Sequence, residues 1–317
     1  MKTVFLDYQT FSKDSDLTSL QQVVDDLTVY ATTSPEQVIA RCQNAEVVLS
    51  NKVLINREIL SQLPKLKLVC ITATGINNID IKAARALNIA VTNVGGYAKN
   101  SVAQYVFAQL LAYYSQIAHH NDNCQKGLWQ QSDTFCLHGN GSIELAGKSI
   151  AIIGYGALGQ KVAEIARAFD MKVLIAERPD AATIRPERMA FLAAIEQADI
   201  ISLHCPQTLE TQGMFNAKLF TRMKPSAILI NTARGALINN EDLLNALNNE
   251  QIACAILDVL EQEPPPKDHI LLAAQSPKLK ITAHIAWASQ QAQQTLLNLV
   301  AENISAFKQW LRTNRVD

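Results

Sequence analysis

Three charged or titratable side chains, suited to transferring a proton or binding an acid, each follow a short apolar stretch in the second half of the chain: Arg234, Glu263 and His284. If those stretches are parallel strands, their carboxyl ends meet at one edge of a sheet, where α/β proteins bind ligands. A histidine exchanges protons near neutral pH, and a carboxylate on its other ring nitrogen stabilises the imidazolium. A guanidinium polarises a carbonyl and grips a neighbouring carboxylate. The set predicts proton transfer to or from a small acid.

Each of these residues also has an ordinary structural interpretation. Taken singly, Arg234 is as typical of a surface ion pair as of a ligand site, and Glu261 competes with Glu263 for the same role. His284 also fits a core histidine whose hydrogen bonds are satisfied. His204 ends another apolar stretch and is expected to line a cofactor groove. The remaining histidines are expected to be solvated: His119, His120, His138 and His269.

A glycine-rich turn, Gly154-x-Gly156-x-x-Gly159, lies between an apolar segment (149–153) and a helix-like segment (160–169). The first glycine permits the turn, the second lets the backbone approach a pyrophosphate, and the third lets the helix pack on its strand. The helix N-terminus would offer free N–H groups to the phosphates. The motif predicts a dinucleotide-binding domain; the alternative is a glycine-rich turn in some other α/β protein.

An acidic residue, Glu177, ends the next predicted strand, at 172–176. A carboxylate at this place accepts hydrogen bonds from the adenosine ribose of a dinucleotide, and it repels a 2′-phosphate. Glu177 therefore predicts NAD(H) rather than NADP(H). Arg178 follows directly and is expected to reduce this preference.

Apolar strand-like segments alternate with helical ones along the chain, which predicts an α/β fold with two doubly wound, Rossmann-like parallel sheets and a cleft between them. Strands are expected at 4–6, 28–30, 47–49, 68–71, 90–92, 149–153, 172–176, 200–204, 227–231, 253–258 and 280–282. Helices are expected at 17–26, 35–42, 56–63, 79–87, 101–117, 160–169, 190–197, 216–223, 240–248 and 289–311. The last helix is expected to return to the first domain. Residues 1–97 and 289–317 would then form a substrate-binding domain, and residues 98–288 a dinucleotide-binding domain.

Composition excludes several classes of protein. With 48% hydrophobic and 18% charged residues, the 317-residue chain is typical of a globular protein large enough for two cores. A formal net charge of −1 supplies no long-range field for nucleic acid or an anionic membrane. No apolar stretch approaches the ~18 residues of a membrane span. Six scattered cysteines without a Cys-x-x-Cys predict buried, reduced thiols in a cytoplasmic protein that has no metal site.

Over essentially its whole length the chain resembles the D-isomer-specific 2-hydroxyacid dehydrogenase family, and within it the bacterial glycerate dehydrogenases, also called hydroxypyruvate reductases. The motifs that carry this resemblance are Ser50-Asn-Lys-Val53, Ala73-Thr-Gly75, Asn93-Val-Gly-Gly-Tyr97, the glycine-rich turn, Leu203-His-Cys-Pro206, Asn231-Thr-Ala-Arg234-Gly235, Glu263-Pro264-Pro265 and His284-Ile-Ala-Trp287. The segment 137–142 matches no familiar motif, and Glu177 stands where the family often has aspartate.

The resemblance implies that Arg234 binds substrate, that His284 is the acid–base group, and that Glu263 rather than Glu261 pairs with it. It implies NAD as the cofactor, with Asp258 against the nicotinamide carboxamide. The other residues expected to bind the cofactor are Gly154, Gly156, Ala157, Leu158, Gly159, Glu177, His204, Cys205, Pro206, Thr232 and Ala233. Further substrate contacts are expected at Asn51, Lys52, Val53, Thr74, Gly75 and Trp287, with backbone near Lys52-Val53 and Gly75 holding the substrate carboxylate.

The expected function is an oxidoreductase that moves a hydride between NADH and a small 2-oxo acid, with hydroxypyruvate preferred, in a homodimer formed through the middle domain. A different function on the same fold is a nucleotide-sensing regulatory protein of the corepressor type. The chain ends at Asp317 without the long extension expected of such a regulator, which favours the enzyme. Formate dehydrogenase chemistry is disfavoured because it does not need a histidine–glutamate relay.

Overall fold

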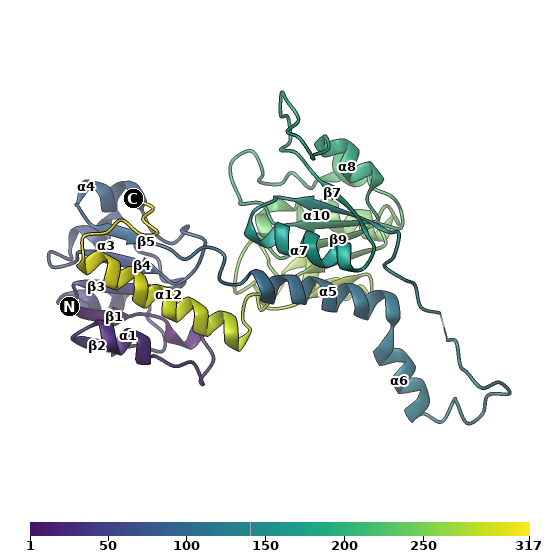
Figure 1. Ribbon diagram of the computed structural model, residues 1–317, viewed down its shortest axis with the longest axis horizontal. Coiled ribbons are helices and arrows are strands. Elements are labelled where there is room, and N and C mark those ends of the chain that lie inside the picture. The colour runs from purple at the N-terminus through teal and green to yellow at the C-terminus, as the bar shows by residue number, and fades with distance from the viewer. Residues whose placement is uncertain (140) are drawn as a thin grey trace. The chain divides into compact units, whose positions relative to one another are not determined.

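The computed structural model describes residues 1–139 and 141–317 (Figure 1). The chain divides into two compact units. One comprises Met1–Ala98 and Trp287–Asp317, and the other comprises Lys99–Ala286. Each unit is built on a parallel sheet with helices on both faces, which is the expected α/β class. The assignment of the units to substrate and dinucleotide binding stays a prediction.

The first unit has a five-stranded parallel sheet in the order β2-β1-β3-β4-β5. Its strands are β1 Lys2–Phe5, β2 Asp26–Val29, β3 Val47–Ser50, β4 Leu68–Ile71 and β5 Ala90–Thr92. Every residue of β3 and β4 is buried, because helices cover both faces of the sheet. The strand order reverses between β1 and β3, and at such a switch point the carboxyl ends of neighbouring strands leave room for a ligand.

Helices from distant parts of the sequence cover the two faces of this sheet. One face packs against α2 (Val38–Cys42), α3 (Arg57–Ser61) and α4 (Ile81–Ala86). The other packs against α1 (Thr18–Val23) and α12 (Gln290–Lys308). In Figure 1, α12 lies beside α1, so the last helix belongs to the N-terminal unit as expected.

The second unit has a six-stranded parallel sheet in the order β11-β10-β9-β8-β6-β7. Its strands are β6 Ser149–Ile153, β7 Lys172–Ile175, β8 Ile200–Leu203, β9 Ile228–Asn231, β10 Cys254–Leu257 and β11 Leu279–Ile281. The strand order reverses between β6 and β8, so the glycine-rich turn after β6 lies next to the segment that follows β8. All six predicted strands of this unit form, most of them one or two residues shorter than expected.

Two layers of helices enclose this second sheet. α5 (Lys99–Ser115) and α7 (Ala157–Ala168) pack on one face. The other face is covered by α8 Phe191–Gln197, α9 Ala217–Phe220, α10 Asn240–Asn248 and α11 Ile270–Ala273. α6 (Ile117–Gln125) follows α5, and in Figure 1 it leads away from the sheet of its own unit.

Several expected helix limits are wrong for identifiable reasons. The helix expected at 101–117 ends at Ser115, because Gln116 adopts a left-handed conformation with φ of 49° before α6 begins. The helix expected at 17–26 ends at Val23, because Asp26 already pairs with Lys2 as the first residue of β2. The helix expected at 35–42 forms, beginning as a short 3-10 turn capped by Ser34.

The thiols differ from expectation in one respect. Cys42, Cys70 and Cys254 are buried, and burial raises the pKa of Cys70 to about 12. Cys124 is exposed, because it lies on α6 outside the cores, so the prediction of buried thiols is wrong for this residue.

Among the helices that the structure describes, none is long and apolar enough to cross a membrane.

Candidate active site

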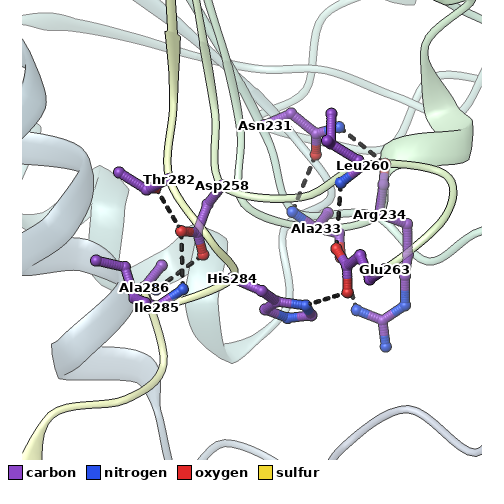
Figure 2. Close-up of polar contacts among 10 residues, drawn as sticks. All are labelled: Asn231, Ala233, Arg234, Asp258, Leu260, Glu263, Thr282, His284, Ile285 and Ala286. Carbon is purple, nitrogen blue, oxygen red and sulfur yellow. Dashed lines mark hydrogen bonds and ion pairs between the residues drawn. The ribbon is translucent and has the colours of Figure 1, made fainter. Parts of the chain in front are cut away.

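His284 and Glu263 form a hydrogen-bonded pair at the carboxyl edge of the second sheet (Figure 2). His284 Nδ1 lies 2.6 Å from Glu263 Oε2, and Glu263 Oε1 accepts from the Leu260 N–H at 3.1 Å. The two side chains are 23% and 31% exposed, so the pair is shielded yet reachable. Because Glu263 engages Nδ1, Nε2 is the ring atom that can face a substrate.

Glu261, the competing carboxylate, has a different partner. It accepts from His269 Nε2 at 3.1 Å, while His269 Nδ1 accepts from the Leu271 N–H at the start of α11. His269 is buried, so the expectation that it is solvated is wrong. The structure therefore separates the two carboxylates: Glu263 pairs with His284, and Glu261 holds a helix cap.

Arg234 lies in a turn that Asn231, the last residue of β9, holds from both sides. Asn231 Nδ2 donates to the Arg234 carbonyl at 2.8 Å, and Asn231 Oδ1 accepts from the Ala233 N–H at 3.0 Å. The next residue, Gly235, touches the loop that leads to Glu263: a Cβ there would lie 1.9 Å from the Leu260 carbonyl carbon. Only glycine permits this approach, which brings the backbone segments carrying Arg234 and Glu263 together.

Asp258 holds the turn that carries His284. Its carboxylate accepts from Thr282 Oγ1 at 2.6 Å and from the N–H groups of Ile285 at 2.9 Å and Ala286 at 2.8 Å (Figure 2). Its own carbonyl accepts from the His284 N–H, and His284 adopts a left-handed φ of 53°. Burial raises the pKa of the Asp258 carboxyl, and these hydrogen bonds act against that rise. Three of about four acceptor positions are thus used to shape the turn; contact with the nicotinamide stays a prediction.

Tyr105, on α5, also contributes to holding the turn that carries His284, because it contacts Thr282. This residue was not identified from the sequence. Its hydroxyl lies 2.6 Å from Thr282 Oγ1. Since Thr282 gives its one hydrogen to Asp258, Tyr105 is the donor, and burial raises the pKa of its hydroxyl. The two residues are 177 positions apart, so no local pattern announces the contact.

The glycine-rich turn has the three features that a pyrophosphate site needs. Gly154 has φ of 96°, and a Cβ there would lie 2.5 Å from the Cys205 backbone nitrogen. A Cβ on Gly159 would lie 2.1 Å from the Gly154 carbonyl oxygen, so α7 packs directly on the turn. Gly156 caps α7 without a side-chain hydrogen bond, and a Cβ there would meet nothing within 4 Å, so a ligand can approach the first N–H groups of the helix, which have no partner within the helix.

Two buried polar atoms near this turn have no hydrogen-bond partner in the described part of the chain: His204 Nδ1 and Thr232 Oγ1. They follow the neighbouring strands β8 and β9, in the segments that also hold Cys205, Pro206 and Ala233. Burial lowers the pKa of His204 to about 4, so its ring is neutral at pH 7, and its Nε2 bonds to Ser202 Oγ. Unpaired buried polar groups are rare, and here they fit a ligand that carries hydrogen-bonding groups, as a dinucleotide does.

In the N-terminal unit the loop Asn51–Val53 is held by Asp7, which follows β1 and was not identified in the sequence. The buried Asp7 carboxylate accepts from the N–H groups of Asn51 at 2.9 Å, Lys52 at 2.6 Å and Val53 at 3.1 Å. The backbone donors expected to hold a substrate carboxylate are therefore turned towards Asp7. The available signal was an acidic residue directly after the strand predicted at 4–6.

Other predicted substrate residues of this unit have defined surroundings. Thr74 Oγ1 donates to the Val94 carbonyl, beside Gly75. The Trp287 ring meets Phe11 and Tyr97 edge to face, at 5.8 and 6.2 Å between centroids. A cavity of about 560 Å³ adjoins the loop and is lined by Asp7, Gln9, Thr10, Ala31, Thr32, Thr33, Pro35, Lys52, Val53, Leu54, Asn56 and Ile59.

The family model of the NAD-binding domain of D-isomer specific 2-hydroxyacid dehydrogenases matches residues 107–286. The chain belongs to this family. The enzyme is 38% identical to a glycerate dehydrogenase of Methylorubrum extorquens over 96% of each chain. It is 36% identical to a hydroxypyruvate reductase of Blautia hydrogenotrophica over 97% of each chain. A solved acyclic imino acid reductase in complex with NADPH and D-Arg superposes with a TM-score of 0.86, at 28% identity over 100% of both chains.

These findings confirm the family, the fold class, the oxidoreductase activity and NAD as the cofactor. They do not support the regulatory alternative. The residues whose geometry could hold NAD are the glycine-rich turn, the start of α7 and the segments after β7, β8 and β9, and their contact with NAD stays a prediction. The described residues contain no group of three or more side chains suited to a metal ion.

Proposed function

We propose that the enzyme reduces hydroxypyruvate to D-glycerate with NADH, with glyoxylate as second substrate and pyruvate much poorer. The proposed type of reaction is supported by the 2.6 Å hydrogen bond between His284 and Glu263, on a turn that Asp258 holds. The choice of acid is supported by the names of two relatives, a glycerate dehydrogenase and a hydroxypyruvate reductase.

His284 is the proposed proton donor. Nε2–H gives its proton to the carbonyl oxygen of the 2-oxo acid, and Glu263 on Nδ1 stabilises the imidazolium before the transfer. Bound NADH supplies the hydride that reaches the carbonyl carbon. The guanidinium of Arg234 binds the carboxylate of the acid and polarises its carbonyl group. The products are the 2-hydroxy acid, NAD⁺ and a neutral His284.

Further substrate contacts are proposed at Asn51, Lys52, Val53, Thr74, Gly75 and Trp287. Because Asp7 already accepts the N–H groups of Asn51, Lys52 and Val53, those three groups reach an acid only if Asp7 releases them. The side chains of this loop and the backbone at Gly75 are therefore the better candidates for the first contact. Asn51, Lys52 and Trp287 are the proposed partners of the hydroxymethyl group of hydroxypyruvate.

The substrate proposal is tested by comparing kcat/KM for hydroxypyruvate, glyoxylate, pyruvate, 2-oxoglutarate and 3-phosphohydroxypyruvate with NADH. An apolar pocket separates hydroxypyruvate from pyruvate by only ~10–200-fold. A pocket that binds the extra hydroxyl leaves buried polar groups unpaired when it is absent, so we expect a ratio above roughly 200. Equal values for the two acids, or a preference for pyruvate or a bulky 2-oxo acid, would reject hydroxypyruvate as the substrate.

Replacing Glu263 with glutamine is expected to shift the pH–rate profile. In the oxidation direction His284 must be neutral to accept a proton, so activity falls as pH drops along the acidic limb. Without the Glu263 charge the imidazolium is less stable, and this limb moves to lower pH. Glu261→Gln is the matched control, since Glu261 pairs with His269, and its profile should stay that of the wild type. A wild-type profile in Glu263→Gln would remove Glu263 from the mechanism.

A homodimer formed through the second unit is also proposed. The apolar face of α5 packs within its own unit, so we place the interface at the exposed apolar residues of α6 and the segment after it. Ile117, Trp129 and Phe135 are 68%, 53% and 91% exposed there, and Trp129 Nε1 donates to the Phe135 carbonyl. Exposed apolar groups gathered in one segment are typical of an interface, and two-fold pairing is the commonest symmetry.

Light scattering tests the dimer. The wild type is expected at twice the chain mass of 34.9 kDa, and Phe135→Asp at a mass closer to one chain. Leu209→Asp, which changes an equally exposed apolar residue elsewhere in the unit, should leave the mass unchanged. A 34.9 kDa wild-type particle at micromolar concentration would contradict the proposal.

The cytoplasm is the proposed compartment. None of the six cysteines, all of which the structure describes, forms a disulfide bond, as is usual for proteins of reducing compartments. Cell fractionation that recovers the enzyme with secreted proteins would reject this assignment.

A further inference from the structure

Glu177, the carboxylate expected to receive the adenosine ribose, already has a full set of donors. It lies two residues after Ile175, the last residue of β7, and is only 4% exposed. Oε1 accepts from the Arg178 N–H at 2.9 Å and from Arg185 Nη2, and Oε2 accepts from the Arg185 N–H at 3.2 Å and from Arg185 Nε at 2.8 Å. A carboxylate offers about four acceptor positions, so a ribose diol must displace a donor to bind here.

Arg185 is the donor that can leave. Its guanidinium meets Glu177 in the two-pronged geometry of a strong pair, yet its side chain is 50% exposed and can swing into solvent. The N–H groups of Arg178 and Arg185, by contrast, belong to the backbone. Adenosine binding at Glu177 therefore competes with the Arg185 side chain.

The surroundings of Glu177 are positively charged. Arg188 Nη1 lies 3.7 Å from Oε1, so the side chains of Arg185 and Arg188 both lie at this carboxylate, and the exposed Arg178 is the next residue in the chain. The Arg185 hydrogen bonds hold the pKa of Glu177 well below its usual range, so the carboxylate stays ionised and paired. Its charge is thus compensated, which weakens the repulsion of a 2′-phosphate that an unpaired carboxylate would exert.

Backbone hydrogen bonds hold the segment that carries Arg185 and Arg188 at the carboxyl end of β7. The Glu177 N–H donates to the Met189 carbonyl, and the Met189 N–H donates to the Ile175 carbonyl, both at 2.8 Å. Ala176 and Met189 also form a parallel bridge. The segment 178–188 is therefore a loop closed at its base, with Arg185 and Arg188 beside the Glu177 carboxylate.

We propose that Arg185 sets the choice between NADH and NADPH: it competes with the ribose diol of NADH for Glu177, and its guanidinium binds the 2′-phosphate of NADPH, so the enzyme takes both cofactors. A guanidinium group can bind a phosphate through two parallel N–H···O hydrogen bonds. The positive charges of Arg178 and Arg188 would add to the attraction. The proposal rests on the dinucleotide site of the family and not on the identity of the acid.

The test measures cofactor binding without turnover. NADH and NADPH are titrated by calorimetry into wild type, Arg185→Ala and Arg222→Ala; Arg222 forms an exposed pair with Glu196 in the same unit and is the matched control. The wild type is expected to bind both cofactors with dissociation constants within about tenfold. Because a hydrogen bond to a charged group is worth roughly one to two powers of ten in affinity, Arg185→Ala should weaken NADPH by ~10–100-fold and tighten NADH. Arg222→Ala should match the wild type.

Three outcomes would overturn the proposal: no measurable NADPH binding by the wild type, wild-type dissociation constants for both cofactors in Arg185→Ala, or an equal loss of affinity for both cofactors in that variant. The last result would mark Arg185 as structural only. If Arg185→Ala does not fold, Arg185→Lys keeps the charge without the fork and should change the ratio in the same direction by a smaller factor. Failure to reduce hydroxypyruvate would leave these binding results untouched, so the two proposals fail separately.

Discussion

Replacing His284 with alanine is expected to lower turnover by roughly 10²–10⁴-fold, because a positioned general acid contributes about that much to a proton transfer. The reducing cofactor should still bind, since its proposed contacts lie at the glycine-rich turn and after β7, β8 and β9. In the reduction direction, the residual rate should lose the dependence on pH that His284 imposes. Steady-state rates with hydroxypyruvate, paired with NADH titrations of the same variant, measure both quantities.

His120→Ala is the control for this variant, because His120 lies on α6, away from the carboxyl ends of the strands. It should keep wild-type turnover. If His284→Ala retained more than about a tenth of the activity, a group other than His284 would have to supply the proton. If it lost NADH binding as well, the effect would report on the turn at Asp258 rather than on proton transfer.

Replacing Gly235 with alanine is expected to lower kcat/KM by ~10²-fold or more. The new Cβ would lie 1.9 Å from the Leu260 carbonyl carbon and 2.2 Å from the Glu261 nitrogen, so the backbone before Glu263 has to move. A misplacement of about 1 Å in a catalytic group costs on the order of 10²-fold. Because a Cβ is fixed to the backbone and the atoms it would meet are also backbone atoms, no change of rotamer relieves the clash. The melting temperature should therefore fall as well.

Gly95→Ala is the matched control, since a Cβ on Gly95 meets nothing within 4 Å. It should keep wild-type activity and stability. Circular dichroism establishes that Gly235→Ala is folded at the assay temperature before rates are compared. Wild-type kcat/KM in Gly235→Ala would show that the contact between the Arg234 turn and the Glu263 loop is dispensable.

The strands and the glycine-rich turn were predictable because they depend on local chemistry. Short β-branched runs such as Ile228–Asn231 are buried wherever they pair, so their residue types alone mark them as strands of a parallel sheet. The turn at Gly154 needs a positive φ, and a pattern of glycines reveals that need without any knowledge of the partner segment. The same holds for Ser34 and Pro35, whose types mark the start of a helix.

The pairing of His284 with Glu263 was predictable only through the family resemblance. Spacing alone left Glu261 and Glu263 as equal candidates, because both follow the same strand within a few residues. The fold separates them: the loop after β10 directs Glu263 Oε2 to His284 and Glu261 to His269. His269 was misjudged for the same reason, since its polar neighbours in sequence say nothing of a partner eight residues away.

Only the tertiary structure shows which partners the residues around the candidate active site bind. Asp7 meets the loop 51–53 from more than 40 residues away, and Tyr105 meets Thr282 across 177 residues. Glu177 could be assigned to the strand end from its sequence, but its four hydrogen bonds to Arg178 and Arg185 depend on how the loop 178–188 folds back to Met189. Residue type and spacing determine which groups stand at the end of a strand. Which donor each group meets there depends on how the loops fold and on contacts between distant segments, and neither leaves a periodic pattern in the sequence.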